Sequence, residues 1–429
     1  MIKNWINESM FYHIYPLGFF GCEMENKGDE NKSDKILKLI DYIPHLKRLG
    51  INALYIGPIF QSATHGYDTT DYKKIDSRLG TNEDFSTVAK ALKDNGISIV
   101  LDGVFNHVGR NFWAFEDVKA NRENSPYCSW ISGLRFDWNN SYNDGFHYDS
   151  WEGHELLVKL NMNNPDVRNH LLDAVEYWID EWDIDGIRLD AADCIDLQFF
   201  RELKQRTTAK KSDFWLMGEI INGEYTRWLQ PDLLDSVTNY ALFNGVYNSL
   251  NSKNLCDIGF NVNREFNKEW GLYKGKLLYN FVDNHDVNRV ASMIQNPKDL
   301  FNVYSIIYTL PGVPSIYYGS EWGIKGDKHN GGDIVLRPEI DVDNIPIENN
   351  ELVEHIAKLS GIRSSRNALK YGDYEQVMSE CLHWAFARNS EDDTALVFVN
   401  TDDNPYHFSV NYRGRQYEQD VEPNSTVVV

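Results

Sequence analysis

The segment Trp182–Cys194, which reads WDIDGIRLDAADC, shows most clearly how this chain folds. Its centre is typical of a short buried β-strand that ends on a carboxylate. Because side chains alternate along a strand, Arg188 and Asp190 share one face, and Ile187 and Leu189 share the other. An arginine beside a carboxylate favours its ionised form, which suits a nucleophile or an electrostatic stabiliser. A structural ion pair at a strand end is the alternative reading of this segment.

Seven more segments are typical of strands, and helical patterns alternate with them. The other predicted strands are Phe11–Leu17, Ala53–Phe60, Ser98–Val104, Phe214–Glu219, Ser236–Leu242, Leu277–Asp283 and Ser315–Gly319. Helices are predicted at Asp34–Leu49, Asn82–Asn95, Asn164–Asp180, Leu197–Arg206, Phe243–Leu250, Leu300–Thr309 and Asn350–Ser364, with a weaker pattern at Glu224–Leu229. Eight such strands predict an α/β fold with a parallel sheet closed into a (β/α)8 TIM barrel. An open, doubly wound sheet has the same alternation and remains an alternative.

Two parts of the chain depart from this alternation. A long polar and aromatic segment follows the third strand, and from Asp373 onward short strands alternate with turns. We therefore predict a barrel built from residues 1–105 and 161–370, an inserted domain at 106–160 and a C-terminal antiparallel β-sandwich at 371–429. Within the insert, Trp130 and Trp138 are candidate platforms for a flat ligand.

Composition excludes several classes of function. The chain has 429 residues and a formal net charge of −22, which argues against nucleic acid or an anionic membrane as a partner. No apolar run of signal-peptide length opens the sequence, and its five cysteines are scattered without the spacing of a metal knuckle or a disulfide framework. We expect a cytoplasmic protein.

The predicted strand ends carry an unusual set of polar residues. The third strand ends in DGVFNH (Asp102–His107), the fifth in Glu219 and the seventh in DNHD (Asp283–Asp286), while HGYD (His65–Asp68) follows the second. In a parallel barrel these ends gather at one face, where the active site lies. Together with Asp190 they supply three well-separated carboxylates. Cleavage of a glycosidic bond needs one carboxylate to attack the anomeric carbon and one carboxylic acid to protonate the leaving oxygen.

An ordered set of motifs strengthens this interpretation. The segments are GINALYIGP (Gly50–Pro58), DGVFNH (Asp102–His107), VKLN (Val158–Asn161), GIRLD (Gly186–Asp190), GE (Gly218–Glu219), FVDNHD (Phe281–Asp286) and GVPSIYYGSE (Gly312–Glu321). In this order they strongly resemble the α-amylase family, glycoside hydrolase family 13. The resemblance runs from about Phe11 to the C-terminus.

The resemblance implies a role for each candidate residue. Asp190 would be the nucleophile, Glu219 the general acid/base and Asp286 a third carboxylate that stabilises the transition state. The implied substrate-binding residues are Tyr67, Asp102, His107, Arg188 and His285. No cofactor is required and no metal ligand is assigned. Calcium remains a candidate, although Asp193 and Cys194 stand where many family members carry a Lys-His pair that serves a calcium site and a plus-side subsite.

The VKLN motif resembles the MPKLN of neopullulanases and cyclomaltodextrinases more than the QPDLN of oligo-1,6-glucosidases. The barrel begins by Phe11, so we expect neither the extra N-terminal domain of that group nor its dimer, but a monomer. The implied activity is a retaining hydrolysis of α-1,4 bonds in maltooligosaccharides, with cyclodextrins and pullulan as further candidates. The alternatives are a transglycosylase or isomerase of the same family, an oligo-1,6-glucosidase, a non-catalytic binding protein and a metal-dependent barrel hydrolase. His13 and His45 have no motif around them and are interpreted as structural.

Overall fold

The computed structural model describes residues 5–28, 33–345 and 350–429, and its centre is a sheet of eight parallel strands. The strands are β1 (Phe11–Ile14), β2 (Ala53–Ile56), β5 (Ser98–Gly103), β9 (Gly186–Leu189), β10 (Trp215–Gly218), β11 (Ser236–Val237), β12 (Tyr279–Asn280) and β13 (Val313–Tyr317). Their order is β11-β10-β9-β5-β2-β1-β13-β12. A parallel bridge between Thr238 and Tyr279 joins the two edges, so the sheet closes into the predicted TIM barrel.

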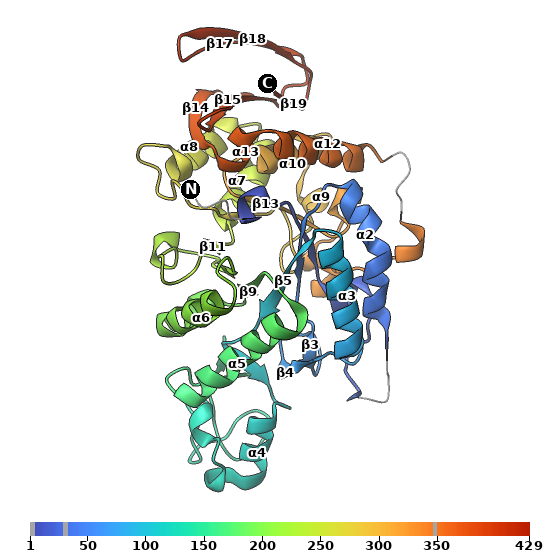
Figure 1. Ribbon diagram of the computed structural model, residues 1–429, viewed down its shortest axis with the longest axis vertical. Helices are drawn as coiled ribbons and strands as arrows, with labels where there is room; N and C mark the ends of the chain where they lie inside the picture. The colour runs from blue at the N-terminus through green and yellow to red at the C-terminus, as the bar shows by residue number, and fades with distance from the viewer. Residues whose placement is uncertain (1–4, 29–32, 346–349) are drawn as a thin grey trace.

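Helices cover the outside of this barrel (Figure 1). The longer ones are α2 (Lys38–Arg48), α3 (Asn82–Asp94), α5 (Pro165–Trp182), α6 (Leu197–Lys210), α7 (Tyr240–Asn251), α8 (Leu255–Phe266), α10 (Asp299–Thr309) and α12 (Glu351–Ser365). Local sequence explains where they begin. Thr81 and Asp84 form a capping box at α3, and Asn164 caps α5 with Pro165 in its first turn. Short helices are α1 (Pro16–Phe19), α9 (Val290–Met293), α11 (Lys328–Gly331) and α13 (Asn367–Tyr371). Among the residues described, no helix combines the length and apolarity needed to span a bilayer.

Two apolar layers hold the barrel together. The inner layer is made by inward-facing aromatic and aliphatic side chains, among them Phe11, Tyr55, Trp215, Met217 and Tyr279, which are all buried. The outer layer lies between the strands and the helices. A filled interior means that ligands can reach only the strand ends, where the predicted site residues lie.

The segment after β5 forms a small sheet and a helix at one end of the long axis (Figure 1). Its elements are β6 (His107–Gly109), α4 (Trp113–Asn121), β7 (Ser150–Trp151) and β8 (His154–Lys159), and the hairpin β3 (Phe60–Ser62) with β4 (Thr69–Ile75) lies beside them. Trp130 packs edge-on against Trp113 and Tyr127 inside this segment and is only 9% exposed. The prediction that Trp130 offers an open platform is therefore wrong, because the segment uses it as core. Trp138 is 64% exposed and stays a candidate.

The C-terminal residues form two antiparallel sheets at the opposite end of the molecule (Figure 1). One contains β14 (Asp373–Ser379), β15 (His383–Asn389), β16 (Thr394–Asn400) and β19 (Ser425–Val428); the other contains β17 (Tyr406–Tyr412) and β18 (Arg415–Val421). Side chains such as Phe398 and Phe408, whose rings lie 5.1 Å apart, pack between the sheets. This agrees with the predicted sandwich.

Several predicted elements differ from the structure. The predicted strand Ser236–Leu242 pairs only over Ser236–Val237, because Asn239 caps α7 and turns the next residues into its first helical turn. Helix α8 and strand β18 were not predicted, and Glu224–Leu229 contains only a 3-10 turn at Tyr225–Arg227.

Candidate active site

A single guanidinium lies at the centre of the predicted site. The Arg188 Nη1 donates to Asp102 at 2.9 Å and to Asp190 at 2.9 Å, and its Nη2 lies 2.7 Å from Glu219 Oε2. These residues come from the ends of β5, β9 and β10, which are neighbours in the barrel. Arg188 and Asp102 are almost completely buried, whereas Asp190 and Glu219 each keep 8% exposure toward the strand ends. The structure therefore brings together four of the predicted residues.

Glu219 has two further contacts. Its Oε1 accepts a hydrogen bond from the Tyr240 hydroxyl at 3.3 Å, and its Oε2 accepts one from the Ala191 backbone N–H at 3.2 Å. Ala191 has a φ of 43°, a left-handed conformation that a non-glycine residue adopts only under local constraint. This turn directs the N–H after Asp190 toward Glu219, so backbone geometry ties the two carboxyls to each other.

Asp286 lies across the site from this group. Its Oδ2 is 3.0 Å from His285 Nε2, and its Oδ1 accepts from Arg337 at 3.0 Å. The hydroxyl of Tyr67 bonds both to Asp102 at 3.0 Å and to His285 Nε2, and the Tyr67 and His285 rings are stacked 5.3 Å apart. Tyr67 thus links the two halves of the site.

His107 occupies the side of the site next to the inserted segment. The Asn106 amide contacts its Nδ1 at 3.2 Å, and its Nε2 has no hydrogen-bond partner among the described residues. The ring of Trp151, on the β7–β8 hairpin, lies 5.7 Å from the ring of His107. An unpartnered buried nitrogen at a strand end is available to a ligand hydroxyl.

Burial and charge shift the pKa values of these groups in different directions. Burial raises the pKa of the Asp190 carboxyl well above its usual value; Arg188 opposes this shift, and Glu219 adds to it. Arg188 is shared among three carboxylates and therefore cannot alone keep Asp190 ionised. Burial also acts on Asp286, but His285 and Arg337 outweigh it and hold the pKa of Asp286 far below its usual range. Burial, with a smaller effect of His65, lowers the pKa of His107 to about 3, so its imidazole is neutral.

Several residues of this site carry no motif signal in the sequence. Arg337 and Tyr240 belong to no quoted motif, yet Arg337 bonds to Asp286 and the Tyr240 hydroxyl bonds to Glu219. Tyr55 lies in the GINALYIGP motif without an assigned role, and its hydroxyl donates to Asp102 at 2.8 Å. His13, interpreted as structural, lies directly beneath the site and packs edge-on against His285 at 5.3 Å. The predicted strand Phe11–Leu17 runs past His13, whereas β1 ends at Ile14 and so brings His13 close to the strand end.

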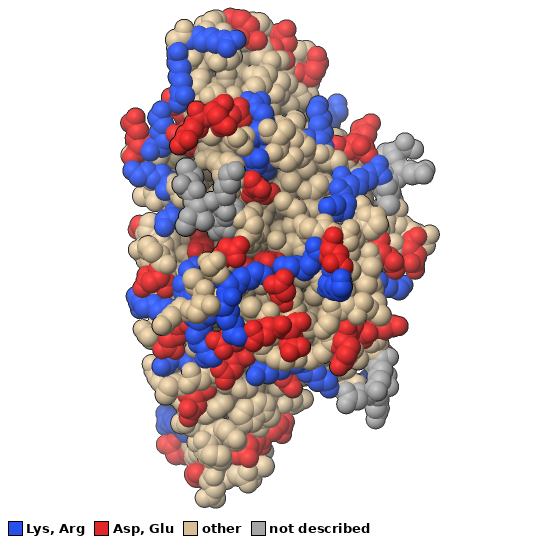
Figure 2. Space-filling view, viewed as in Figure 1, with Lys and Arg blue, Asp and Glu red and all other residues tan. Residues whose placement is uncertain are grey.

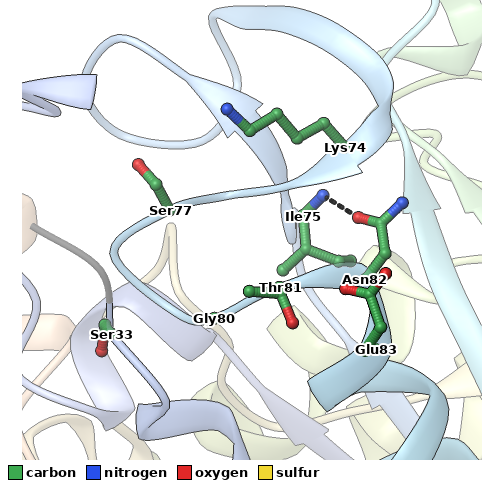
Figure 3. Close-up of a pocket in the computed structure, with 8 residues that line it drawn as sticks. All are labelled: Ser33, Lys74, Ile75, Ser77, Gly80, Thr81, Asn82 and Glu83. Carbon is green, nitrogen blue, oxygen red and sulfur yellow. Dashed lines mark hydrogen bonds between the residues drawn. The ribbon is translucent and has the colours of Figure 1, made fainter. Parts of the chain in front are cut away.

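A pocket of about 250 Å3 beside α3 contains none of these residues (Figure 3). Two of its polar groups serve the fold, since the Ile75 N–H donates to Asn82 at 2.9 Å and Thr81 caps the helix with Asp84. Within the described ranges, no three His, Cys, Asp or Glu side chains are grouped as metal ligands would be. Acidic and basic side chains are mixed over the face seen in Figure 2.

Comparison with known proteins places this geometry in a family. The family described as "Alpha amylase, catalytic domain" matches residues 13–375. A cyclomaltodextrinase of Geobacillus thermopakistaniensis is 31% identical over 424 residues, which cover 92% of this chain and 69% of that protein. A maltogenic alpha-amylase of Bacillus acidopullulyticus is 29% identical and covers 95% and 72%, respectively.

A solved structure is similar over its whole length. The cyclic alpha-maltosyl-(1→6)-maltose hydrolase from Arthrobacter globiformis superposes with a TM-score of 0.86 at 28% identity and covers 100% of this chain and 99% of that one. Sequence, fold and the grouped carboxylates agree: this chain belongs to the α-amylase family of glycoside hydrolases.

Proposed function

We propose that this protein is a retaining α-glucan hydrolase that cleaves α-1,4-glucosidic bonds of maltooligosaccharides. The observation that carries the proposal is that Asp190 and Glu219 bind the two terminal nitrogens of one guanidinium, Arg188. This arrangement keeps the two carboxyls close to each other. A separation of about 5–5.5 Å is typical of retaining enzymes, whereas inverting enzymes need room for a water molecule between the carboxyls.

In the first step, the Asp190 carboxylate attacks the anomeric carbon while Glu219 gives its proton to the departing glycosidic oxygen. The carbon–oxygen bond breaks and a covalent glycosyl–enzyme forms. This step requires the proton on Glu219 and an ionised Asp190. Burial and the neighbouring Glu219 raise the pKa of Asp190, and the Arg188 guanidinium, which donates to Asp190 at 2.9 Å, is the group that favours its ionised form.

In the second step, the Glu219 carboxylate takes a proton from water as the water oxygen attacks the anomeric carbon. The bond to Asp190 breaks, the sugar leaves with its original configuration, and Glu219 is protonated again. The Tyr240 hydroxyl and the Ala191 N–H hold the Glu219 carboxyl in place during both proton transfers.

The remaining residues bind the sugar whose anomeric carbon reacts. Asp286 is ionised, because His285 and Arg337 lower its pKa, and its carboxylate is suited to accept two ring hydroxyls. Neutral His107 offers its unpartnered Nε2 to another hydroxyl, and the Tyr67 ring provides a flat face beside them. No step of this mechanism uses a metal.

The test is hydrolysis of maltoheptaose, with and without EDTA, followed by early-time NMR of the released anomers. We expect α-anomeric maltooligosaccharides at the same rate in both conditions. Initial β-anomers would contradict Asp190 as nucleophile, and loss of activity in EDTA would contradict a metal-free site. Products longer than the substrate would indicate transglycosylation instead of hydrolysis.

A second substrate deserves a parallel assay. The structure with nearly identical extent is a hydrolase of cyclic alpha-maltosyl-(1→6)-maltose, and the relatives named above include a cyclomaltodextrinase. Comparing kcat/KM for maltoheptaose, β-cyclodextrin, pullulan and that cyclic tetrasaccharide ranks linear against cyclic α-glucans. If kcat/KM for the cyclic tetrasaccharide is about tenfold or more above that for maltoheptaose, the cyclic sugar replaces the linear substrate in this proposal.

A further inference from the structure

A groove outside the active site runs between α7 and α8. It consists of two hollows, of about 380 and 280 Å3, that share Ala241. The side chains along it recur every three or four residues, as those on one face of a helix do. They are Ala241, Asn244 and Asn248 on α7 and Phe260, Asn261 and Arg264 on α8.

One end of the groove lies at the rim of the active site. Ala241 follows Tyr240, whose hydroxyl donates to Glu219. The opposite wall includes Tyr225, which lies in the loop after Glu219 and whose hydroxyl accepts from the Ala241 N–H at 3.4 Å. A flexible chain long enough to leave the active site on this side would meet the groove.

Phe260 is the most exposed large apolar side chain in the described part of the protein, at 68%. It lines the first hollow together with residues of α7, and it is not among the residues of the buried core. The C–H face of a pyranose ring is apolar and flat, and it suits an exposed phenyl ring.

The polar residues of the groove suit hydroxyl groups. The side-chain amides of Asn248 and Asn261 make no hydrogen bond within the described residues, and the Arg264 guanidinium forms no ion pair there. An amide offers both donors and an acceptor without net charge, which matches a sugar hydroxyl that both donates and accepts. Phosphate or carboxylate ligands would instead require a cluster of cations.

The second hollow has a buried carboxyl in its lining. Glu265 is 7% exposed, and within the described part of the chain its carboxyl receives one long hydrogen bond of 3.5 Å, from Asn239. Burial raises the pKa of Glu265 to about 7, against the effects of Asn239 and Arg264. Beside it the rings of Tyr225 and Tyr273 stack 5.2 Å apart. A carboxyl beside aromatic rings can accept from two adjacent hydroxyls of one sugar.

We propose that the α7–α8 groove is a second α-glucan-binding site, in which the ring of Phe260 stacks on a sugar and the amides of Asn248 and Asn261 bind its hydroxyls. The proposal rests on the proposed function, because both sites take the same polymer. Attachment at two points raises the local concentration of chain ends at the active site. Long α-glucans gain from this effect, whereas short oligosaccharides reach only one site at a time.

The test uses native gels that contain amylopectin, with all variants built on Asp190→Asn so that the polymer stays intact. Phe260→Ala removes the platform. Gly245→Leu fills the groove floor, where an added Cβ would meet only Ile258, at 3.8 Å. Tyr142→Ala is the matched control, since it removes a half-exposed aromatic ring from the inserted segment.

We expect both groove variants to raise the dissociation constant for amylopectin about fivefold and the control to leave it unchanged. With Asp190 restored, Phe260→Ala should raise KM for amylose by a similar factor and leave kcat/KM for maltotriose as it was. Equal gel retardation of Phe260→Ala and its parent would contradict the proposal that the groove binds α-glucan.

The two proposals fail separately. The parent protein could hydrolyse maltoheptaose while Phe260→Ala and Gly245→Leu leave its retardation in the gel unchanged. This result would refute the groove proposal alone. A parent protein that binds amylopectin through Phe260 without cleaving any α-glucan refutes the hydrolase proposal and supports the groove.

Discussion

Arg188 is the residue on which the charges of the site depend. It is completely buried and faces Asp102, Asp190 and Glu219. Replacing it with methionine leaves these carboxylates buried together without a cation. We expect Arg188→Met to lower the free energy of unfolding by about 3–5 kcal/mol at pH 7. The loss should shrink at pH 4.5, because burial raises the pKa of Asp190 and its protonation removes one of the buried negative charges. Urea unfolding at both pH values measures this, and an equal loss at both would contradict the shared-charge account.

The role of Asp190 as nucleophile can be tested with one substitution. Asp190→Asn keeps the shape of the side chain but cannot attack the anomeric carbon, so we expect kcat/KM for maltoheptaose to fall by at least about a thousandfold. Asp193→Asn, three residues on and exposed, is the matched control and should keep full activity. If Asp190→Asn is fully active, the nucleophile lies elsewhere.

His107 makes stability depend on pH in a predictable direction. Its pKa is about 3 in the folded protein and about 6.5 when unfolded, so below pH 6.5 only the unfolded chain takes up its proton. Its contribution to stability is therefore complete above pH 6.5 and is lost as the pH falls toward 3. Between pH 7 and pH 5 the uptake of this proton by the unfolded chain lowers the free energy of unfolding by about 2 kcal/mol. In His107→Gln this contribution is absent. Over the same pH interval we therefore expect its unfolding free energy to fall by about 2 kcal/mol less than that of the parent protein. Parallel losses would show that His107 is not held neutral.

At the scale of elements, the sequence predicted strands well where apolar runs are bounded by polar ends. All eight barrel strands and the resulting fold class are confirmed. The strand prediction was wrong where a single capping residue starts a helix. The apolar run after Ser236 continues as α7 because Asn239 caps this helix. Strand β18 was missed because charged and polar residues occupy most of its positions.

For the candidate site too, some residues could be predicted from the sequence and others could not. Residues at the ends of predicted strands could be found, since parallel strands bring their ends together. Arg337 could not be found, because it follows no strand and reaches Asp286 only through the path of its loop. Tyr240 was placed in the wrong element, which hid its contact with Glu219.

The cap of α7 links helix stability to catalysis. The Asn239 side chain accepts from the Leu242 N–H, and the next residue is Tyr240. We expect Asn239→Ala to cost about 2–3 kcal/mol of unfolding free energy, because the buried amide also bonds to Asn280 and Glu265, and to lower kcat about tenfold, because Tyr240 no longer holds Glu219 in place. Asn350→Ala removes the side-chain cap of α12, should cost about 1 kcal/mol and should leave kcat unchanged. Equal kcat in the two variants would contradict the link.

At the scale of the whole molecule, the barrel and the C-terminal sheets share one core. Trp384 and Phe386 belong to the same buried cluster as the barrel helices. The buried guanidinium of Arg388 donates to the Thr309 carbonyl at the end of α10, at 2.6 Å, and to the carbonyls of Gly372 and Asp373. A continuous core that also contains this shared cation should unfold cooperatively.

We therefore expect a single calorimetric transition for the whole chain. Arg388→Met leaves three carbonyls without their donor and should lower the free energy of unfolding by about 3 kcal/mol, while the transition stays single. Arg415→Met, on the exposed β18, is the matched control and should change neither quantity. Two separate transitions, of which Arg388→Met moves only one, would mean that the sheets fold independently of the barrel. The C-terminal residues would then be an attached module, whereas the shared cluster around Trp384 makes them part of the scaffold on which α10 and the barrel depend.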